Sequence, residues 1–135
     1  MRTGMAIATV LVLFIAVFGC AMTPEITGIL WKWKQSIYGN DTEATPPKPE
    51  NYTVLLRQDG SLEIRADCNR CGGTYQLDDR HLSMQVTYCT RAMCPPGSLD
   101  QVFIRDLNAA VIYFLKDGDL LIDLKYDSGT MRFSR

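Results

Sequence analysis

The sequence predicts a mainly β protein, an antiparallel β-barrel-like sheet with one α-helix. Three observations support this fold class. Short stretches of alternating, β-branched and aromatic residues recur along the chain, and their spacing is typical of an antiparallel sheet or barrel. Asp-Gly pairs at 59–60 and 117–118 separate several of these stretches and supply the geometry that tight hairpins need. Only the segment 99–108 carries apolar residues at helical spacing.

The N-terminus has the features of a bacterial export signal. Arg2 precedes an apolar run over residues 5–18, which is shorter than the ~20 residues that span a bilayer and has the length of a signal-peptide core. The sequence Val-Phe-Gly-Cys, which ends at Cys20, resembles a lipobox. We therefore expect residues 1–19 to be a lipoprotein-type signal peptide and Cys20 to be the lipid attachment site. Two alternatives stay open: ordinary cleavage after Ala21, and retention of the run as a membrane anchor.

The remaining chain, roughly 115 residues, suits one domain with one core. We expect a tether over residues 20–29 and the folded domain over residues 30–135. The first strand is predicted at 30–34, where Trp31 and Trp33 alternate with lysines. Alternate residues of a strand share one face, so we expect the two tryptophans to be core residues.

A long loop and two hairpins follow this strand. The polar, proline-bearing residues 39–51 are predicted to form a long exposed loop. Residues 52–57 and 62–66 flank the first Asp-Gly pair and are predicted to form a hairpin. Residues 73–77 and 82–88 are predicted to pair around a second polar turn.

One helix interrupts the strands. Ser98 and Gln101 have the spacing of a capping box, in which both side chains satisfy backbone N–H groups at the start of a helix. Phe103 and Leu107 follow at helical spacing, so we expect a helix over 99–108 with its apolar stripe on the sheet. Three closing strands are expected at 112–115, 120–124 and 131–133.

Two segments carry a family resemblance. They are residues 67–75, Asp-Cys-Asn-Arg-Cys-Gly-Gly-Thr-Tyr, and residues 89–96, Cys-Thr-Arg-Ala-Met-Cys-Pro-Pro. Together with the Trp-Lys-Trp of the first strand and a C-terminal Gly-Thr-Met-Arg-Phe, in this order and spacing, they resemble the META domain family, which includes a small bacterial heat-shock protein. The resemblance implies a barrel-like antiparallel β-structure with one helix. It marks five motif residues, Asp67, Asn69, Gly73, Tyr75 and Thr90.

The cysteines allow three interpretations. Without the predicted lipidation site four remain, an even number that favours two disulfides in an exported protein. A four-thiolate zinc site and a redox-active Cys-x-x-Cys are the alternatives; an oxidising compartment disfavours the first and the lack of a βαβ pattern the second. The residues alone allow three connectivities. The family resemblance implies the pair Cys68 with Cys94, which leaves Cys71 to pair with Cys89.

Other chemistry is sparse in the sequence. The formal net charge is −1, and no basic segment is clustered, so we expect no nucleic acid partner. His81 is the only histidine and falls in a predicted turn, where we expect a solvated side chain. No glycine-rich phosphate loop, calcium-loop spacing or catalytic triad is complete. The sequence therefore predicts no enzymatic activity, no metal and no cofactor.

Two function classes fit these observations. The first is an exported module held at the membrane by a lipid anchor, on the periplasmic side of the bacterial cell envelope and expected at the outer membrane. The resemblance suggests a role in envelope homeostasis or stress, with an unknown envelope protein or peptide as partner. The second is a small-ligand binder or an inhibitor of a secreted hydrolase that uses the 39–51 loop, whose prolines lower the ordering cost of binding. A secreted or soluble periplasmic protein is the alternative location.

Overall fold

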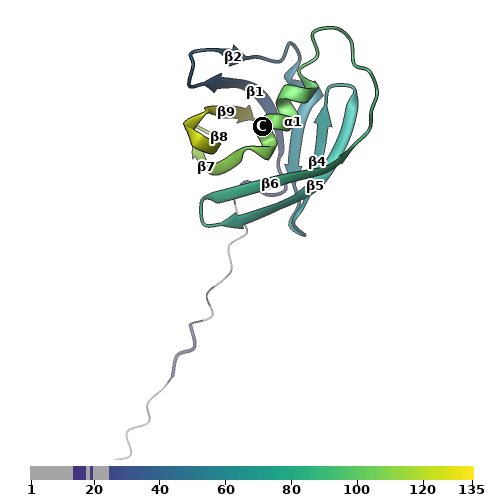
Figure 1. Ribbon diagram of the computed structural model, residues 1–135. Helices are drawn as coiled ribbons and strands as arrows, with labels where there is room; N and C mark the ends of the chain where they lie inside the picture. Colours follow the sequence, from purple (N-terminus) through teal and green to yellow (C-terminus); the bar gives the residue numbers. More distant parts are fainter. Residues whose placement is uncertain (1–13, 18, 20–24) are drawn as a thin grey trace, which may run out of the picture.

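The computed structural model describes residues 14–17, 19 and 25–135. In Figure 1, residues 25–135 form a curved antiparallel sheet around one helix. Eight strands close into a barrel because β1 pairs with both β3 and β9. The predicted fold class is confirmed. The barrel strands are β1 Leu30–Tyr38, β3 Tyr52–Leu56, β4 Ser61–Ala66, β5 Asn69–Asp78, β6 His81–Cys89, β7 Ala110–Lys116, β8 Asp119–Leu124 and β9 Gly129–Ser134.

Residues 39–51 are largely exposed, as the sequence predicts, but the segment is not irregular throughout. Within them β2, Glu43–Ala44, pairs antiparallel with β1 and lies outside the closed barrel. Pro46 is buried, and a short 3-10 helix, η1 Pro49–Asn51, leads directly into β3. Polar composition indicated a loop, but the segment is docked on the barrel.

The core is filled from the inner face of the strands. Trp31 and Trp33 are both fully buried, as predicted. Trp33 stacks on Phe103 with ring centroids 5.0 Å apart, and Tyr52 meets both rings edge-on. This aromatic cluster joins the helix to the sheet, because Phe103 lies on the helix and the other two rings lie on strands. Fully burying a side chain of this size contributes about 2–3 kcal/mol.

The barrel has a weak seam between β6 and β7. Their pairing consists of His81 with Ile112, and the helix that connects them, α1 Asp100–Asn108, packs beside the seam within the curve of the strands (Figure 1). The side chain of Asn108 accepts a hydrogen bond from the backbone N–H of Val86 at 2.9 Å. The helix therefore replaces the missing strand contacts along part of β6.

The start of the helix differs from the predicted capping box. Leu99 is the N-cap residue and makes no side-chain cap hydrogen bond. Ser98 accepts a hydrogen bond from the backbone N–H of Asp100 at 3.3 Å, and Gln101 donates to the Asp100 carboxylate rather than reaching back to the backbone. The box pattern located the helix start to within one residue but gave the wrong contacts.

Residues 25–29, which the sequence assigns to the tether, pack against the barrel. Ile26 is fully buried, its carbonyl oxygen accepts from Nε1 of Trp31 at 3.0 Å, and the N–H of Gly28 donates to the carbonyl of Leu56. Cys20 and residues 1–13 and 18 of the predicted signal peptide lie outside the described residues. In the described part of the chain, no helix has the length and apolar composition to cross a membrane.

Aspartates hold several tight turns in the left-handed backbone region. Asp67, Asp79 and Asp117 have φ of 57°, 54° and 53°, a conformation that Asp tolerates better than most residues. In the predicted Asp-Gly turn between β3 and β4, only Gly60 has a positive φ, 87°, while Asp59 accepts from the N–H of Ser61 at 2.9 Å. That hairpin forms as predicted, with a different turn.

Candidate functional site

The four cysteines form two disulfides at one end of the barrel. Cys68, in the turn between β4 and β5, is bonded to Cys94, with Cα atoms 5.5 Å apart. Cys71 on β5 is bonded to its direct cross-strand partner on β6, Cys89. This is the pairing that the family resemblance implies. Because each sulfur is held in one of these bonds, the four-thiolate site and the Cys68–Cys71 dithiol are not formed.

Asn69 holds the segment that carries Cys94. Its side chain is 5% exposed, and its Oδ1 accepts from the backbone N–H of Ala92 at 2.8 Å and from the hydroxyl of Thr90 at 3.0 Å. Its Nδ2 donates to the carbonyl of Ala92 at 3.1 Å. The amide therefore bonds the facing segment rather than its own turn. We call residues 67–71 and 89–94, with both disulfides, the clasp.

Thr90 and Asp67 complete the clasp. The Thr90 hydroxyl accepts from the backbone N–H of Arg70 at 2.9 Å, and the Thr90 N–H donates to the carbonyl of Arg70 at 2.9 Å. The backbone N–H of Asp67 donates to the carbonyl of Asn51, which ties the turn to the lead-in of β3. Three of the five motif residues thus position backbone rather than present a reactive group.

The motif residue Tyr75 contacts the β3–β4 hairpin and not the clasp. Its hydroxyl donates to the backbone carbonyl of Arg57, and its backbone N–H donates to the carbonyl of Gly60 at 3.0 Å. Burial is the main cause that raises the pKa of Tyr75 above its ordinary value. This motif residue therefore fixes the β3–β4 hairpin onto β5 and takes no part in the clasp.

Gly73 and its neighbour Gly72 differ in what a side chain would meet. A Cβ at Gly73 would overlap the backbone carbonyl of Gln85, because β5 and β6 approach closely at an irregularity in their register. A Cβ at Gly72 would overlap only the ring of Tyr88, whose side chain is 67% exposed and has room to turn. A side chain at the motif residue Gly73 would therefore clash with backbone atoms, which cannot move aside as a side chain can.

Gly73→Ala is expected to lower the free energy of unfolding by about 2 kcal/mol, since steric overpacking costs about 1–3 kcal/mol. Gly72→Ala serves as the matched control and is expected to cost less than about 1 kcal/mol, because an exposed side chain can move aside. Urea unfolding of both variants measures the difference. If both variants lose the same free energy of unfolding, the close backbone approach at Gly73 is not the reason that glycine is needed there.

An open groove of about 930 Å³ lies beside the clasp. Its walls are the end of β6, the connection 90–98 and the first turns of α1, with Ile104 and Gln101 on the helix side. Two large side chains are exposed there: Met93 is 97% exposed and Tyr88 67%. We call this the clasp groove. One disulfide holds the connection at Cys94, and the other holds the end of β6 at Cys89. The outer wall of the groove is therefore held in place without a ligand.

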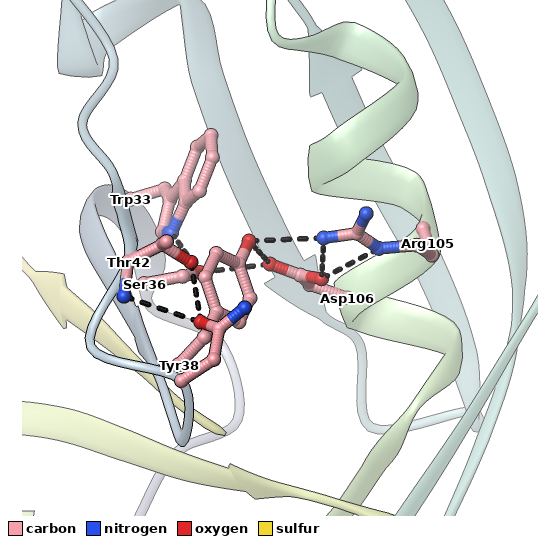
Figure 2. Close-up of polar contacts among 7 residues, drawn as sticks. Trp33, Ser36, Tyr38, Thr42, Arg105 and Asp106 are labelled. Atoms are coloured by element: carbon pink, nitrogen blue, oxygen red, sulfur yellow. Dashed lines mark hydrogen bonds and ion pairs between the residues drawn. The ribbon is translucent and has the colours of Figure 1, made fainter. Parts of the chain in front are cut away.

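A second polar site, which the sequence did not indicate, lies at the other end of α1. Figure 2 shows Asp106 receiving hydrogen bonds from two residues of β1 and from its helix neighbour Arg105. The Asp106 carboxylate is 2% exposed, and it accepts from the hydroxyl of Ser36 at 2.9 Å and from that of Tyr38 at 2.6 Å. Arg105 donates to it from Nε and Nη2, at 3.1 and 2.9 Å. We call these four residues the Asp106 network.

A β-bulge explains why the sequence did not reveal this network. Strict alternation from Trp31 and Trp33 would point Gln35 and Ile37 inward. The register of β1 against β9 shifts between Trp33 and Gln35, so Ser36 is fully buried and Ile37 is 53% exposed. A bulge of this kind reverses the faces of all later residues in a strand, and no residue in this stretch signals it.

Tyr38 is the titratable group that the network perturbs most clearly. Burial, followed by the hydrogen bond to Asp106 and the charge of that carboxylate, raises the pKa of Tyr38 from 10.0 to about 12. Because the folded state holds this proton more tightly than the unfolded chain, its contribution to stability is complete below pH 10. It is lost as pH rises towards 12.

The expected result is that Tyr38 remains protonated at pH 10.5 to 11 in the folded protein. Absorbance at 295 nm, compared between wild type and Tyr38→Phe, isolates its phenolate signal. The same comparison in urea-unfolded protein should place the transition near the ordinary value of about 10. A Tyr38 signal that rises near pH 10 in the folded state would contradict a closed hydrogen bond to Asp106.

His81 and the Asp-rich turns are the remaining polar features that the sequence singled out. His81 is exposed and begins β6, where it pairs across the seam with Ile112. Within the described residues, no group of three or more His, Cys, Asp or Glu side chains is arranged to hold a metal ion. The candidate sites are therefore the clasp groove and the Asp106 network.

The fold and the clasp define a class of protein: a small closed β-barrel with one helix, cross-linked at one end by two disulfides. Residues 25–135 match the family model described as META domain. The chain therefore belongs to the META domain family, as the motifs predicted. Among curated proteins, none matches it in sequence.

Several solved structures are similar to this chain, including the following two. The NMR structure of a protein from Burkholderia xenovorans has a TM-score of 0.67 at 20% identity, covering 87% of this chain and 94% of that one. The crystal structure of a DUF4847 family protein from Bacteroides vulgatus has a TM-score of 0.59 at 16% identity, covering 82% and 94%. At these identities the likeness shows the fold alone.

Proposed function

We propose that the protein is a non-enzymatic, exported lipoprotein of the bacterial cell envelope whose clasp groove binds an extended segment of another protein. The observation that carries the proposal is a partly unpaired strand beside the groove. Along β6, only His81 pairs with β7 in the described structure, while the far end of the strand, residues 86–89, lines the groove. A strand edge next to a groove is the arrangement that recognises extended peptides by strand addition.

The exposed side chains suit such a partner. Met93 is flexible and apolar, and Met is favoured at surfaces that accept varied apolar side chains. The two disulfides support the proposal in a second way, because a wall held in place before binding reduces the ordering cost of the complex. A role in envelope homeostasis or stress tolerance is part of this proposal and rests on the family resemblance.

The experiment selects peptides from a random library on the oxidised protein and measures their affinity by calorimetry. Met93→Asp is expected to weaken the selected peptides at least tenfold, because it replaces the exposed apolar side chain beside the groove with a charge. Tyr126→Asp is the matched control: Tyr126 is also 97% exposed but does not line the groove. Peptides that bind both variants equally, or a library that yields no binder, would refute the groove as a peptide site.

Lipid attachment at Cys20 has its own test. Radiolabelled palmitate is expected to enter the wild-type protein, and Cys20→Ser is expected to abolish both the label and membrane retention. With alanine after the cysteine, the usual sorting rule for lipoproteins places the protein at the outer membrane. Density separation of the two membranes measures that step. Label that persists in the Cys20→Ser variant would remove the lipoprotein part of the proposal.

A further inference from the structure

Two arginines face each other on the outside of the barrel. Arg65 on β4 and Arg70 on β5 are direct partners across the antiparallel pair, and side chains of direct partners point to the same face. The next pair along, Ile64 with Cys71, is buried. The two guanidinium groups therefore lie on the outer surface, although the residues are not clustered by charge in the sequence.

No carboxylate neutralises this pair in the described part of the chain. Like charges directly opposite each other destabilise a sheet, yet neither arginine takes part in an ion pair. The acidic residue two positions before Arg65, Glu63, is already paired with Arg57. The side chain of Arg65 instead donates from Nε to the backbone carbonyl of Asp67 at 3.1 Å, which holds its guanidinium beside the hairpin.

The surroundings of the pair are rigid and include an aromatic ring. Both backbone groups of Arg70 are bonded to Thr90, and the clasp disulfides flank it on either side in sequence. Tyr88 is the direct partner of Gly72, and its ring covers that glycine on the same outer face as Arg70. A ring that is 67% exposed thus lies next to two uncompensated cations.

We propose that Arg65 and Arg70 bind a phosphate group of an envelope ligand, with Tyr88 contacting the part of the ligand that carries it. Guanidinium groups donate paired N–H bonds that match the oxygens of a phosphate. Cross-strand partners are about 5 Å apart at Cβ, so both can reach one phosphate, whose charge cancels their repulsion. The same chemistry occurs in an anionic lipid headgroup and in a soluble phosphate ester. Neither arginine lines the clasp groove, but Tyr88 does, so the phosphate site and the groove meet at that ring.

Thermal unfolding in phosphate and in chloride at equal ionic strength tests the site. The protein is exported through a non-lipidating signal peptide, so that no acyl chain contributes to binding. At a tenfold excess of phosphate over its dissociation constant, the midpoint is expected to rise by about 4 °C or more. The double variant Arg65→Gln, Arg70→Gln should lose this rise, whereas Arg80→Gln, an exposed arginine in the β5–β6 turn, should keep it.

The double variant also separates specific binding from the general stabilising effect of phosphate as a salt, which acts on every variant. Co-sedimentation with phosphatidic acid vesicles, against phosphatidylcholine vesicles, identifies the source. Binding to the anionic vesicles that fails in the double variant supports a lipid headgroup, and a phosphate effect without vesicle binding supports a soluble phosphate ester. No phosphate-specific rise, or an equal rise in wild type and double variant, overturns the proposal.

Discussion

Replacing Cys68 and Cys94 together by alanine is expected to lower the free energy of unfolding by about 3 kcal/mol. The bridge spans 26 residues of sequence, and the loss of that constraint on the unfolded chain costs about 3.5 kcal/mol in the chain-entropy model, within the measured range of about 2–5 kcal/mol for small exported domains. For a domain whose total stability is about 5–15 kcal/mol, the loss is large. Urea unfolding of the oxidised protein measures it.

The second bridge provides the control. Cys71 and Cys89 are separated by 18 residues, which gives about 3.2 kcal/mol in the same model, so the two losses should be similar. Their local effects should differ. Without the Cys68 bridge, only hydrogen bonds from Asn69 and Arg70 still hold the 90–94 segment, so hydrogen exchange should increase there and not in the centre of β5. An unchanged urea midpoint in the Cys68, Cys94 variant would show that this bridge does not stabilise the folded protein.

The hairpins and the helix could be predicted because their signals are local. Alternation placed Trp31 and Trp33 in the core, and both are fully buried. Turn residues located the hairpins, and helical spacing located α1 to within one residue of its observed start and at its observed end. Each of these signals depends on residues within one or two turns of each other, where backbone geometry alone links pattern to structure.

The contacts between distant strands could not be read in the same way. Ser36 and Asp106 are 70 positions apart, and only the bulge in β1 turns the serine inward. Arg65 and Arg70 are close in sequence, but their apposition follows from the two-residue turn that sets the register of β4 against β5. Pro46 is buried although its segment is polar. Strand register brings together the first two pairs, and packing of the 39–51 segment on the barrel buries Pro46. Neither register nor packing of this kind leaves a pattern in the local sequence.

The clasp was the exception among long-range features. The family resemblance implied the Cys68–Cys94 bridge, and Cys71 and Cys89 then remained to pair with each other. The role of Asn69 could not be predicted from the residues alone, because its amide bonds Ala92 and Thr90 across the clasp. A motif asparagine that lies next to a bridged cysteine is the signal that pointed towards this contact.

Asp106→Ala is expected to destabilise the protein by about 2–3 kcal/mol, mainly because it leaves buried donors without an acceptor. Ser36 is fully buried and already accepts from Nε1 of Trp33 at 3.1 Å, so its hydroxyl proton would lose its partner. An unsatisfied buried polar group costs about 1–3 kcal/mol. Arg105 adds little, since its side chain is 62% exposed and water can replace the carboxylate.

Arg105→Gln separates these two contributions. It removes the exposed member of the ion pair but leaves the hydrogen bonds from Ser36 and Tyr38 intact. Because the guanidinium is 62% exposed and screened by solvent, we expect its contribution to be about 0–1 kcal/mol. Its loss should therefore be at most a third to a half of that of Asp106→Ala in urea unfolding followed by tryptophan fluorescence. Equal losses in the two variants would mean that the ion pair, and not the buried hydrogen bonds from β1, joins the end of α1 to the barrel.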